Sequence, residues 1–326
     1  MDKKKNGQFF TVGNPFRLRG FREWYEMIPN KTRFLEPFAG ANNLVRMMDE
    51  VFGEKEWGSF DIEPMDEKVV FRDTLAEMPK GYDAIVTNPP YLARNSATRS
   101  GIKFSEENKY DDLYKFCLDR MLREYDFVAA IIPESFITSG QFREKLFSTI
   151  SLTRNMFADT DCPVCIAMFV DEEVKAKYLG DRDFYLYQLD EMVGKYSEIY
   201  GYFKREILDK MSGAGVKFRF NDPEGKIGLW GVDNTKRESI HFGDGEMIPA
   251  SKIKISSRAI TRISGPVDDV EGVAKKANEI LMEFRENTKD VFMTAFKGLR
   301  ADGKYRRRLD YKIANCILNV ARQETI

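Results

Sequence analysis

Tyr82-Asp83-Ala84-Ile85-Val86-Thr87-Asn88-Pro89-Pro90-Tyr91 is the stretch that decides how this chain folds. Its apolar run predicts a buried strand that ends at Thr87. Two prolines then fix their own φ angles and push Asn88 toward extended geometry. The Asn88 side chain and nearby carbonyls therefore stand at the carboxyl end of a strand, with the ring of Tyr91 just beyond. This group can grip a planar amino group, although Asn-Pro and Pro-Pro also occur in plain strand-ending turns.

Short apolar runs alternate with amphipathic stretches through the first half of the chain. The predicted strands are Arg33–Glu36, Trp57–Ile62, Val69–Phe71, Tyr82–Thr87, Phe127–Ile132 and Val164–Val170. The predicted helices between them are Asn43–Phe52, Asp111–Tyr125 and Gln141–Ile150. This alternation indicates an α/β fold with a Rossmann-like, mostly parallel sheet. Ligands of such sheets bind outside the carboxyl ends of the strands.

The pattern changes after about residue 171. Helical stretches are expected at Tyr196–Met211, Gly272–Phe296 and Tyr305–Gln323, and strand-like runs at Val216–Phe220 and Lys252–Ile255. We therefore expect two domains, as is usual for a chain of 326 residues. Residues 1–175 would form the catalytic sheet domain and residues 176–326 an α+β domain.

The bulk composition narrows the classes of protein. With 43% hydrophobic and 32% charged residues, the chain can bury cores and stay soluble. It has no run of about 18 or more apolar residues and no secretory apolar core at its amino terminus, which predicts a cytoplasmic protein without a membrane segment. The Cys162-Pro163-Val164-Cys165 motif has no second ligand pair, and His241 is the only histidine. We therefore expect no metal site and no disulfide framework.

Charge is unevenly distributed although the net charge is only −1. The basic residues of the second half gather in two segments, which contain Lys252, Lys254, Arg258 and Arg262, and Lys304, Arg306, Arg307 and Arg308. Such segments can bind a polyanion locally. Solvated surfaces of an ordinary domain would show the same composition.

Acidic residues mark the ends of three successive predicted strands, at Glu36, Asp61 and Asp73. Glu36 suits a cationic amino-acid group. Asp61 comes about 20 residues after Gly40, the spacing at which a carboxylate accepts ribose hydroxyls in dinucleotide folds. Asp73 could contact an adenine amino group. One ligand combines an amino acid, a ribose and an adenine, and we expect S-adenosylmethionine as the cofactor.

The loop after Glu36 reads Pro37-Phe38-Ala39-Gly40-Ala41-Asn42. Gly40 lets the backbone approach a ligand closely. A strict dinucleotide fingerprint would have glycine in place of Asn42. Asparagine tolerates positive φ, so the same turn remains accessible.

In this order, the motifs resemble the gamma-class amino-methyltransferases of DNA, the adenine-N6 kind found in restriction–modification systems. The resemblance covers residues 7 to about 170. It includes a leading motif, Gly7-Gln8-Phe9-Phe10-Thr11 with Asn14-Pro15-Phe16, the cofactor loop, the full Asn-Pro-Pro-Tyr motif, and Ile131-Ile132-Pro133-Glu134-Ser135-Phe136. The second half matches no motif, and only its position and basic clusters indicate target recognition.

The resemblance implies a role for each matching residue. Catalysis would rest on Asn88, Pro89, Pro90 and Tyr91. Cofactor contacts would come from Phe10, Thr11, Glu36, Pro37, Phe38, Ala39, Gly40, Asp61, Ile62, Asp73 and Asn88. Tyr91 and Phe169 would stack on the target base, with a place in the core as the alternative for Phe169. Outside the resemblance, and on their charge alone, the eight basic residues named above are candidate DNA contacts. The product would be S-adenosylhomocysteine, the partner double-stranded DNA, and the source bacterial or phage-encoded. A cognate restriction endonuclease and action as a monomer are further expectations.

The implied reaction is a direct transfer of the methyl group to the amino nitrogen of a flipped-out adenine. Methylation of RNA, or of a protein glutamine, remains an alternative, because the tetrapeptide is shared with such enzymes. A nucleic-acid-binding module on a degenerate methyltransferase scaffold is a third interpretation, and cytosine at its exocyclic nitrogen is a fourth.

Overall fold

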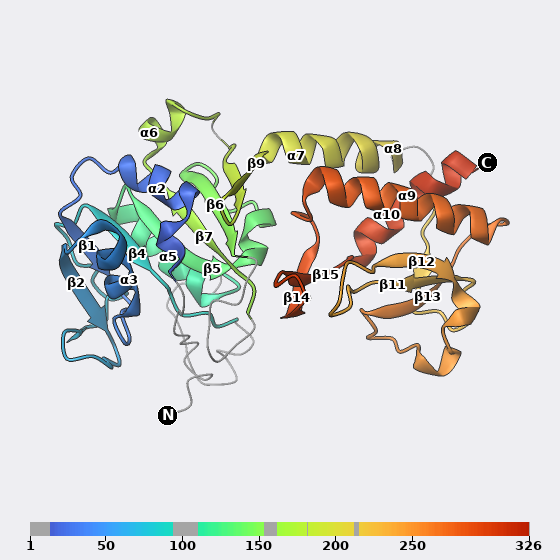
Figure 1. Ribbon diagram of the computed structural model, residues 1–326, viewed down its shortest axis with the longest axis horizontal. Coiled ribbons are helices and arrows are strands. Elements are labelled where there is room, and N and C mark those ends of the chain that lie inside the picture. The colour runs from blue at the N-terminus through green and yellow to red at the C-terminus, as the bar shows by residue number, and fades with distance from the viewer. Residues whose placement is uncertain (1–13, 94–109, 153–161, 181, 212–214, 326) are drawn as a thin grey trace. The chain divides into compact units, whose positions relative to one another are not determined.

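The computed structural model describes residues 14–93, 110–152, 162–180, 182–211 and 215–325. It divides the chain into two compact units that meet in sequence between Lys195 and Tyr196 (Figure 1). The expected boundary after residue 175 falls short of this division. The reason is that two further strands pair with the sheet of the first unit before that unit ends.

The first unit is built on one large sheet (Figure 1). Within the described residues this sheet has nine strands in the order β3-β2-β1-β4-β5-β7-β6-β8-β9. The strands are β1 (Arg33–Glu36), β2 (Glu56–Asp61), β3 (Val70–Phe71), β4 (Ala84–Thr87), β5 (Val128–Pro133), β6 (Leu146–Leu152), β7 (Val164–Phe169), β8 (Tyr185–Gln188) and β9 (Glu191–Lys195). The first five strands are parallel, whereas β7 runs antiparallel to both β5 and β6. This sheet confirms the α/β, Rossmann-like fold class.

Helices cover the sheet on both sides. They are η1 (Pro15–Arg17), α2 (Arg19–Glu26), α3 (Asn43–Phe52), α5 (Leu113–Glu124), η2 (Glu134–Thr138) and α6 (Glu172–Ala176). One core joins Trp24 of α2 and Met48 of α3 to Phe34 of β1. Side chains alternate along a strand, and the next residues along β1 and β4, Leu35 and Ile85, are also fully buried. Both faces of the central strands are therefore covered, as a parallel sheet requires.

The helix expected at Gln141–Ile150 is wrong. The described chain turns there and then forms β6, whose seven residues are all buried. A fully buried strand and a buried helix cannot be distinguished by periodicity. Pairing of β6 with β7 and β8 decides the outcome, because it satisfies the backbone on both edges of the strand.

The second unit has a small antiparallel sheet, a hairpin and two long helices. The sheet order is β10-β13-β11-β12, from β10 (Arg219–Phe220), β11 (Ile227–Trp230), β12 (His241–Asp244) and β13 (Ile260–Ser264). The hairpin pairs β14 (Thr294–Leu299) with β15 (Tyr305–Arg308). The helical elements are α7 (Tyr196–Phe203), η3 (Lys204–Leu208), α8 (Asp209–Met211), η4 (Gly245–Met247), η5 (Ala250–Lys252), α9 (Val270–Thr288) and α10 (Tyr311–Thr325). Helix α9 packs on α10, α7 and β12.

Three expectations for this unit need correction. The helix predicted at Gly272–Phe296 ends at Thr288 and is followed by β14, and the one predicted at Tyr305–Gln323 begins with strand β15. The strand predicted at Lys252–Ile255 does not form: Lys252 ends η5, and the chain continues into a turn that begins at Ile255. Helix α9 stops where Lys289 and Asp290 take positive φ, a conformation that aspartate favours but lysine does not indicate.

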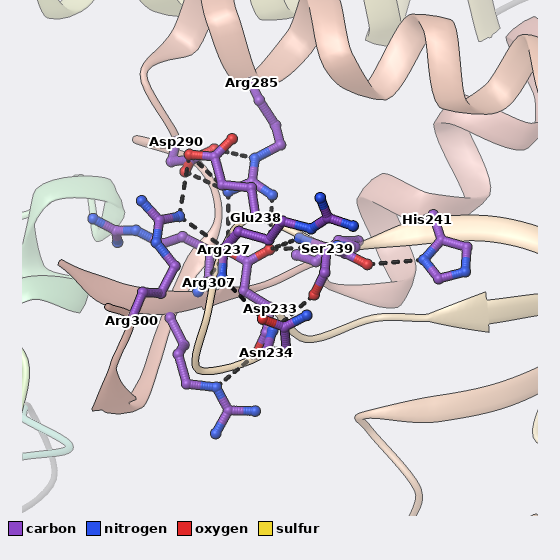
Figure 2. A network of polar contacts seen from close by, with 12 residues as sticks. Asp233, Asn234, Arg237, Glu238, Ser239, His241, Arg285, Asp290, Arg300 and Arg307 are labelled. Atoms are coloured by element: carbon purple, nitrogen blue, oxygen red, sulfur yellow. Dashed lines mark hydrogen bonds and ion pairs between the residues drawn. The ribbon is translucent and has the colours of Figure 1, made fainter. Parts of the chain in front are cut away.

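A buried ionic network joins three parts of the second unit (Figure 2). Asp233 is fully buried and accepts two hydrogen bonds from Arg285 of α9, at 2.9 and 3.0 Å. Arg300 of the hairpin lies 3.4 Å from the same carboxylate, and the backbone N–H groups of Ser239 and Arg307 also donate to it. Burial acts to raise the pKa of Asp233, but Arg285 and these N–H groups outweigh it and the pKa is lowered. The network therefore ties the β11–β12 loop to α9 and to the hairpin.

Candidate active site

Two of the predicted motifs meet at the point where the strand order of the sheet reverses. The chain runs from β1 outward to β3 and returns to form β4 on the other side of β1. Glu36 ends β1, and Thr87, which ends β4, donates a hydrogen bond of 2.6 Å to it. Asn88 follows Thr87 directly. The cofactor loop and the Asn-Pro-Pro-Tyr motif therefore start from neighbouring strand ends, at the edge where doubly wound sheets bind ligands.

Glu36 is the most strongly perturbed carboxyl group of this edge. Its side chain is 1% exposed, and one oxygen, Oε1, accepts from Thr87 and from the Phe38 backbone N–H. The other oxygen, Oε2, is buried and has no hydrogen-bond partner among the described residues. Burial raises the pKa of Glu36 to about 8, against the two hydrogen bonds and with a small contribution from Asp61. An unsatisfied acid in this position suits a cationic ligand group, which would supply the missing partner.

The loop after Glu36 adopts the turn expected of it. Gly40 and Asn42 both have positive φ, 49° and 59°. The tolerance of asparagine for this conformation thus preserves the turn without the glycine of the dinucleotide fingerprint. Asn42 precedes α3 and is 4% exposed, and its buried Oδ1 has no partner among the described residues. The loop is held to β2 by the Ala39 N–H, which donates to the Phe60 carbonyl.

Asp61 ends β2 beside this loop. One carboxylate oxygen accepts from the Gly40 N–H and the other from the Glu63 N–H, both at 2.8 Å. Burial raises its pKa, partly offset by these bonds. Each oxygen of a carboxylate can accept more than one hydrogen bond, so two ribose hydroxyls remain acceptable ligands. Ile62, the next residue, is 56% exposed and offers an apolar surface beside the carboxylate.

Asp73 follows β3 as expected, but its carboxylate is used locally. One oxygen accepts from the backbone N–H groups of Leu75 and Ala76, at 3.0 and 3.2 Å. The side chain is exposed. Its second oxygen is the one that could reach an adenine, and that contact stays a prediction.

Tyr91 holds Asn88 in place. Its hydroxyl lies 2.5 Å from Asn88 Oδ1 and 2.6 Å from the Ile131 carbonyl oxygen of β5, and its single proton can go to either. The ring is partly buried, packs against the core of the sheet and meets Tyr114 edge-on at 6.2 Å. Burial raises the Tyr91 pKa well above its usual value, so the hydroxyl keeps its proton.

Phe169 is not a base-stacking residue in this structure. It is fully buried in β7, between β5 and β6, with its ring edge-on to Phe136 at 6.0 Å. The carbonyl of Phe169 accepts a hydrogen bond from the Trp24 indole. The position that the resemblance assigned to a stacking aromatic is therefore a core position. Phe10 and Thr11 lie outside the described residues.

The eight basic candidates fall into two groups. Four of them are exposed: Lys252, Lys254, Arg258 and Lys304. The other four bind within the second unit. Arg262 donates to the Ile248 and Pro223 carbonyls, Arg306 to the Asp233 carbonyl, and Arg308 pairs with Asp310. Arg307 is only 6% exposed. The prediction of phosphate contacts by Arg307 is therefore wrong, since burial keeps it from a duplex.

A family model matches residues 25–159 of the chain. Its description is Eco57I restriction-modification methylase. The chain is similar to this family over the matched segment. That segment contains the cofactor loop, the three acidic strand ends and the Asn-Pro-Pro-Tyr motif, so the resemblance to restriction-modification methylases is confirmed there. A comparison with curated protein sequences finds no match.

Solved structures show a more distant likeness to part of this chain. A protein assigned as a modification subunit of a type I restriction enzyme from Vibrio vulnificus has 17% identity and a TM-score of 0.40, and the match covers 56% of this chain and 47% of that one. A class I S-adenosylmethionine-dependent methyltransferase from Listeria monocytogenes has 13% identity and a TM-score of 0.39, with 55% and 68% covered. The type I restriction-modification methyltransferase subunit from Streptococcus thermophilus has 16% identity and a TM-score of 0.37, with 56% and 47% covered. The chain thus spans about half the length of the two restriction-modification subunits. These likenesses are too distant to support a functional conclusion.

S-adenosylmethionine is the cofactor that the matched methylase family implies, and the residues of the edge fit it. Glu36 offers a buried acceptor without a partner, and Gly40 leaves room for close approach of a ligand. Asp61 adds a carboxylate at the end of the next strand. Among the described residues no group of His, Cys, Asp and Glu side chains is placed to hold a metal ion. No helix in the described part of the chain is long and apolar enough to cross a membrane.

Sequence reasoning missed Thr87 and the hydroxyl of Tyr91. Thr87 connects the two motifs, and it could have been found only by assuming that β4 pairs with β1. The hydroxyl of Tyr91 reaches Ile131, 40 residues away in sequence. No local signal indicates such a contact.

Proposed function

We propose that this protein transfers the methyl group of S-adenosylmethionine to the N6 nitrogen of adenine in double-stranded DNA. The observation that carries the proposal is the hydrogen bond between Thr87 and Glu36. It brings the carboxyl ends of β1 and β4 together, and with them the cofactor loop and the Asn-Pro-Pro-Tyr motif. A bound cofactor and an amino group held by Asn88 would therefore be neighbours.

The proposed chemistry depends on positioning and hydrogen bonding. The exocyclic nitrogen of adenine is a weak nucleophile, because its lone pair is delocalised into the ring. In our proposal Asn88 Oδ1 and the Pro89 carbonyl accept hydrogen bonds from the two N–H groups of this amine. These bonds favour a tetrahedral nitrogen. The cofactor would supply an electrophilic methyl group on a sulfonium. The sulfur would keep the electron pair of the broken S–CH3 bond, and the methylated nitrogen would release one proton to solvent. No covalent enzyme intermediate is needed, and catalysis comes from orientation and electrostatics.

Tyr91 has two roles in this proposal. In our proposal its hydroxyl donates to Asn88 Oδ1 and so orients the amide toward the adenine amino group. A face of its ring would stack on the flipped base, a contact worth about 1–3 kcal/mol for a base on an aromatic side chain. The target base must leave the duplex, because the amino nitrogen cannot be reached within the stack.

We propose double-stranded DNA as the partner and the second unit as the target recognition domain. Exposed Lys252, Lys254, Arg258 and Lys304 support this assignment through their charge. Contacts to phosphate would position the protein rather than read its sequence. Monomeric action and a cognate restriction endonuclease stay predictions.

The test is the identity of the methylated product. Purified protein is incubated with methyl-labelled S-adenosylmethionine and mixed-sequence duplex DNA, and the product is digested to nucleosides. We expect label in N6-methyldeoxyadenosine. Asn88→Ala should lower the turnover rate by about 10²–10³-fold, the usual loss for one positioned hydrogen-bonding group. Binding of S-adenosylmethionine should survive, because the contacts proposed for Glu36 and Asp61 remain.

Asn30→Ala is the matched control, because Asn30 is exposed and precedes β1 at the opposite edge of the sheet. It should retain normal turnover. Label in RNA, in a protein glutamine or in cytosine, with none in adenine of DNA, would overturn the proposed substrate. Normal turnover by Asn88→Ala would overturn the proposed catalytic motif.

A further inference from the structure

One loop of the second unit combines basic charge with an exposed apolar tip. The 251–258 loop, residues Ser251–Arg258, lies between β12 and β13 (Figure 1). It carries three exposed basic side chains, Lys252, Lys254 and Arg258, and no acidic residue. At its centre Ile255 is 94% exposed, the highest fraction among the large hydrophobic side chains of the described residues. A single exposed hydrophobic residue is ordinary on a protein surface. Its place between three cations needs an explanation.

The backbone of the loop is braced from two sides. The Asn221 side-chain amide donates to the Ile255 carbonyl at 2.8 Å and to the Ser257 carbonyl at 3.3 Å. The Tyr311 hydroxyl donates to the same Ser257 carbonyl at 2.7 Å. Ser257 closes a turn with its N–H on the Lys254 carbonyl and bonds the Ile260 carbonyl through its hydroxyl. Ile255 therefore projects from a fixed backbone.

The braces themselves are anchored in the unit. Tyr311 begins α10 and stacks on Phe220 of β10, with ring centroids 4.4 Å apart. The Arg258 guanidinium lies 5.5 Å from the centre of the Tyr311 ring. Asn221 has a φ of 58° and its backbone N–H donates to Thr261 of β13. A surface that is held in its binding conformation loses less conformational entropy when a partner binds.

We infer that the 251–258 loop docks on duplex DNA, with Ile255 pressed as an apolar wedge against a base step. Lys252, Lys254 and Arg258 contact the phosphates on either side. The inference rests on the proposed function for its choice of polyanion. Charge complementarity selects the occupant, since the loop is purely cationic in a chain whose net charge is −1. Exposed apolar side chains between cations are used in this way by proteins that wedge and kink DNA.

The test distinguishes the contribution of Ile255 to DNA binding from the contributions of the basic side chains. Binding of the full chain to a mixed-sequence duplex is measured by fluorescence anisotropy at several salt concentrations. Ile255→Ala should weaken binding about tenfold at every salt concentration, because an apolar contact releases no counterions. Lys254→Gln should lower the slope of log K against log salt by about 0.9. The fluorescence of a duplex that contains 2-aminopurine should increase when the wild type binds. The increase should be smaller with Ile255→Ala and equal to that of the wild type with Ile255→Phe.

Met282→Ala is the matched control, since Met282 is 67% exposed on α9, in the same unit. It should bind like the wild type. Equal affinity of Ile255→Ala and wild type, or an unchanged salt slope in Lys254→Gln, would overturn the inference. Loss of a concentration-dependent dimer by Ile255→Ala, with DNA binding intact, would show that the loop binds a second copy instead.

These outcomes do not depend on methyl transfer. If no adenine is methylated, the binding experiment still decides the role of the loop. If adenine is methylated and Ile255→Ala binds and brightens as the wild type does, the loop assignment fails and the proposed function stands.

Discussion

Binding of the cofactor should release a proton from Glu36. The free protein holds this carboxyl group at a pKa of about 8, chiefly because it is buried. The α-ammonium group of S-adenosylmethionine would stabilise the charged form and lower that pKa. Free Glu36 is about 1% ionised at pH 6 and about 9% at pH 7 if its pKa is near 8. The ligand amine, with a pKa near 7.7–8.0, stays mostly protonated over this range. The dissociation constant should therefore fall about eightfold between pH 6 and pH 7.

Calorimetry measures both the affinity and the proton. Titrations of S-adenosylmethionine at pH 6.5, in buffers of different ionisation enthalpy, should show nearly one proton released per ligand bound. 5′-Methylthioadenosine lacks the amino-acid group and is the matched ligand control; it should release none. Glu36→Gln should bind S-adenosylmethionine more weakly at pH 8 and without proton release. A flat affinity between pH 6 and pH 7, equal for the two ligands, would refute the role assigned to Glu36.

The same group affects the stability of the free protein. A carboxyl group whose folded-state pKa is raised contributes stability that is fully present below its unfolded pKa, near 4.5, and is lost as the pH rises through 8. Glu36→Gln should therefore match the wild type in thermal stability near pH 4 and exceed it at pH 8. If the thermal stability of the wild type rose relative to that of Glu36→Gln as the pH rises, the Glu36 carboxyl group could not be buried without compensation.

Three further predictions concern other parts of the chain. Asp233→Ala leaves the buried Arg285 with Asp290 as its remaining close carboxylate partner and should cost about 1.5–3 kcal/mol in urea unfolding at pH 7. This cost should shrink as the pH falls through the lowered pKa of Asp233. A cost below 1 kcal/mol at pH 7 would refute the stabilising role of Asp233. Phe169→Ala should destabilise the protein by about 3–5 kcal/mol through a core cavity, whereas an effect on base capture alone would restore its stacking role. Tyr91→Phe should lower kcat about tenfold with little change in KM for DNA, since it removes the hydroxyl bond to Asn88, and an unchanged kcat would exclude that role.

The local sequence patterns of the first unit were sufficient to predict most of its helices and strands. The sequence predicted β1 and α3 with the observed bounds, and β2, β3, β4 and β5 to within two residues, whereas β8 and β9 were not predicted. These segments have short apolar runs between turn residues, and pairing and burial agree with the local preference. The positive φ of Asn42 was also predictable, because asparagine tolerates it.

What failed depends on contacts between distant residues. The apolar run of β6 resembles a helix until β7 and β8 pair with it. Phe169 was assigned to base stacking because a motif position does not report burial. The network around Asp233 joins residues more than 50 positions apart, so no spacing rule could indicate it. Arg307 was similarly counted as a surface cation.

Methylation of host DNA in a living cell tests the central claim most directly. The genome of a host that expresses the protein is sequenced with detection of modified bases, beside a host that expresses Asn88→Ala. We predict N6-methyladenine at one recurrent sequence context with the wild type and none above background with the variant. An unmodified genome with well-folded wild-type protein, or equal methylation with Asn88→Ala, would contradict the account.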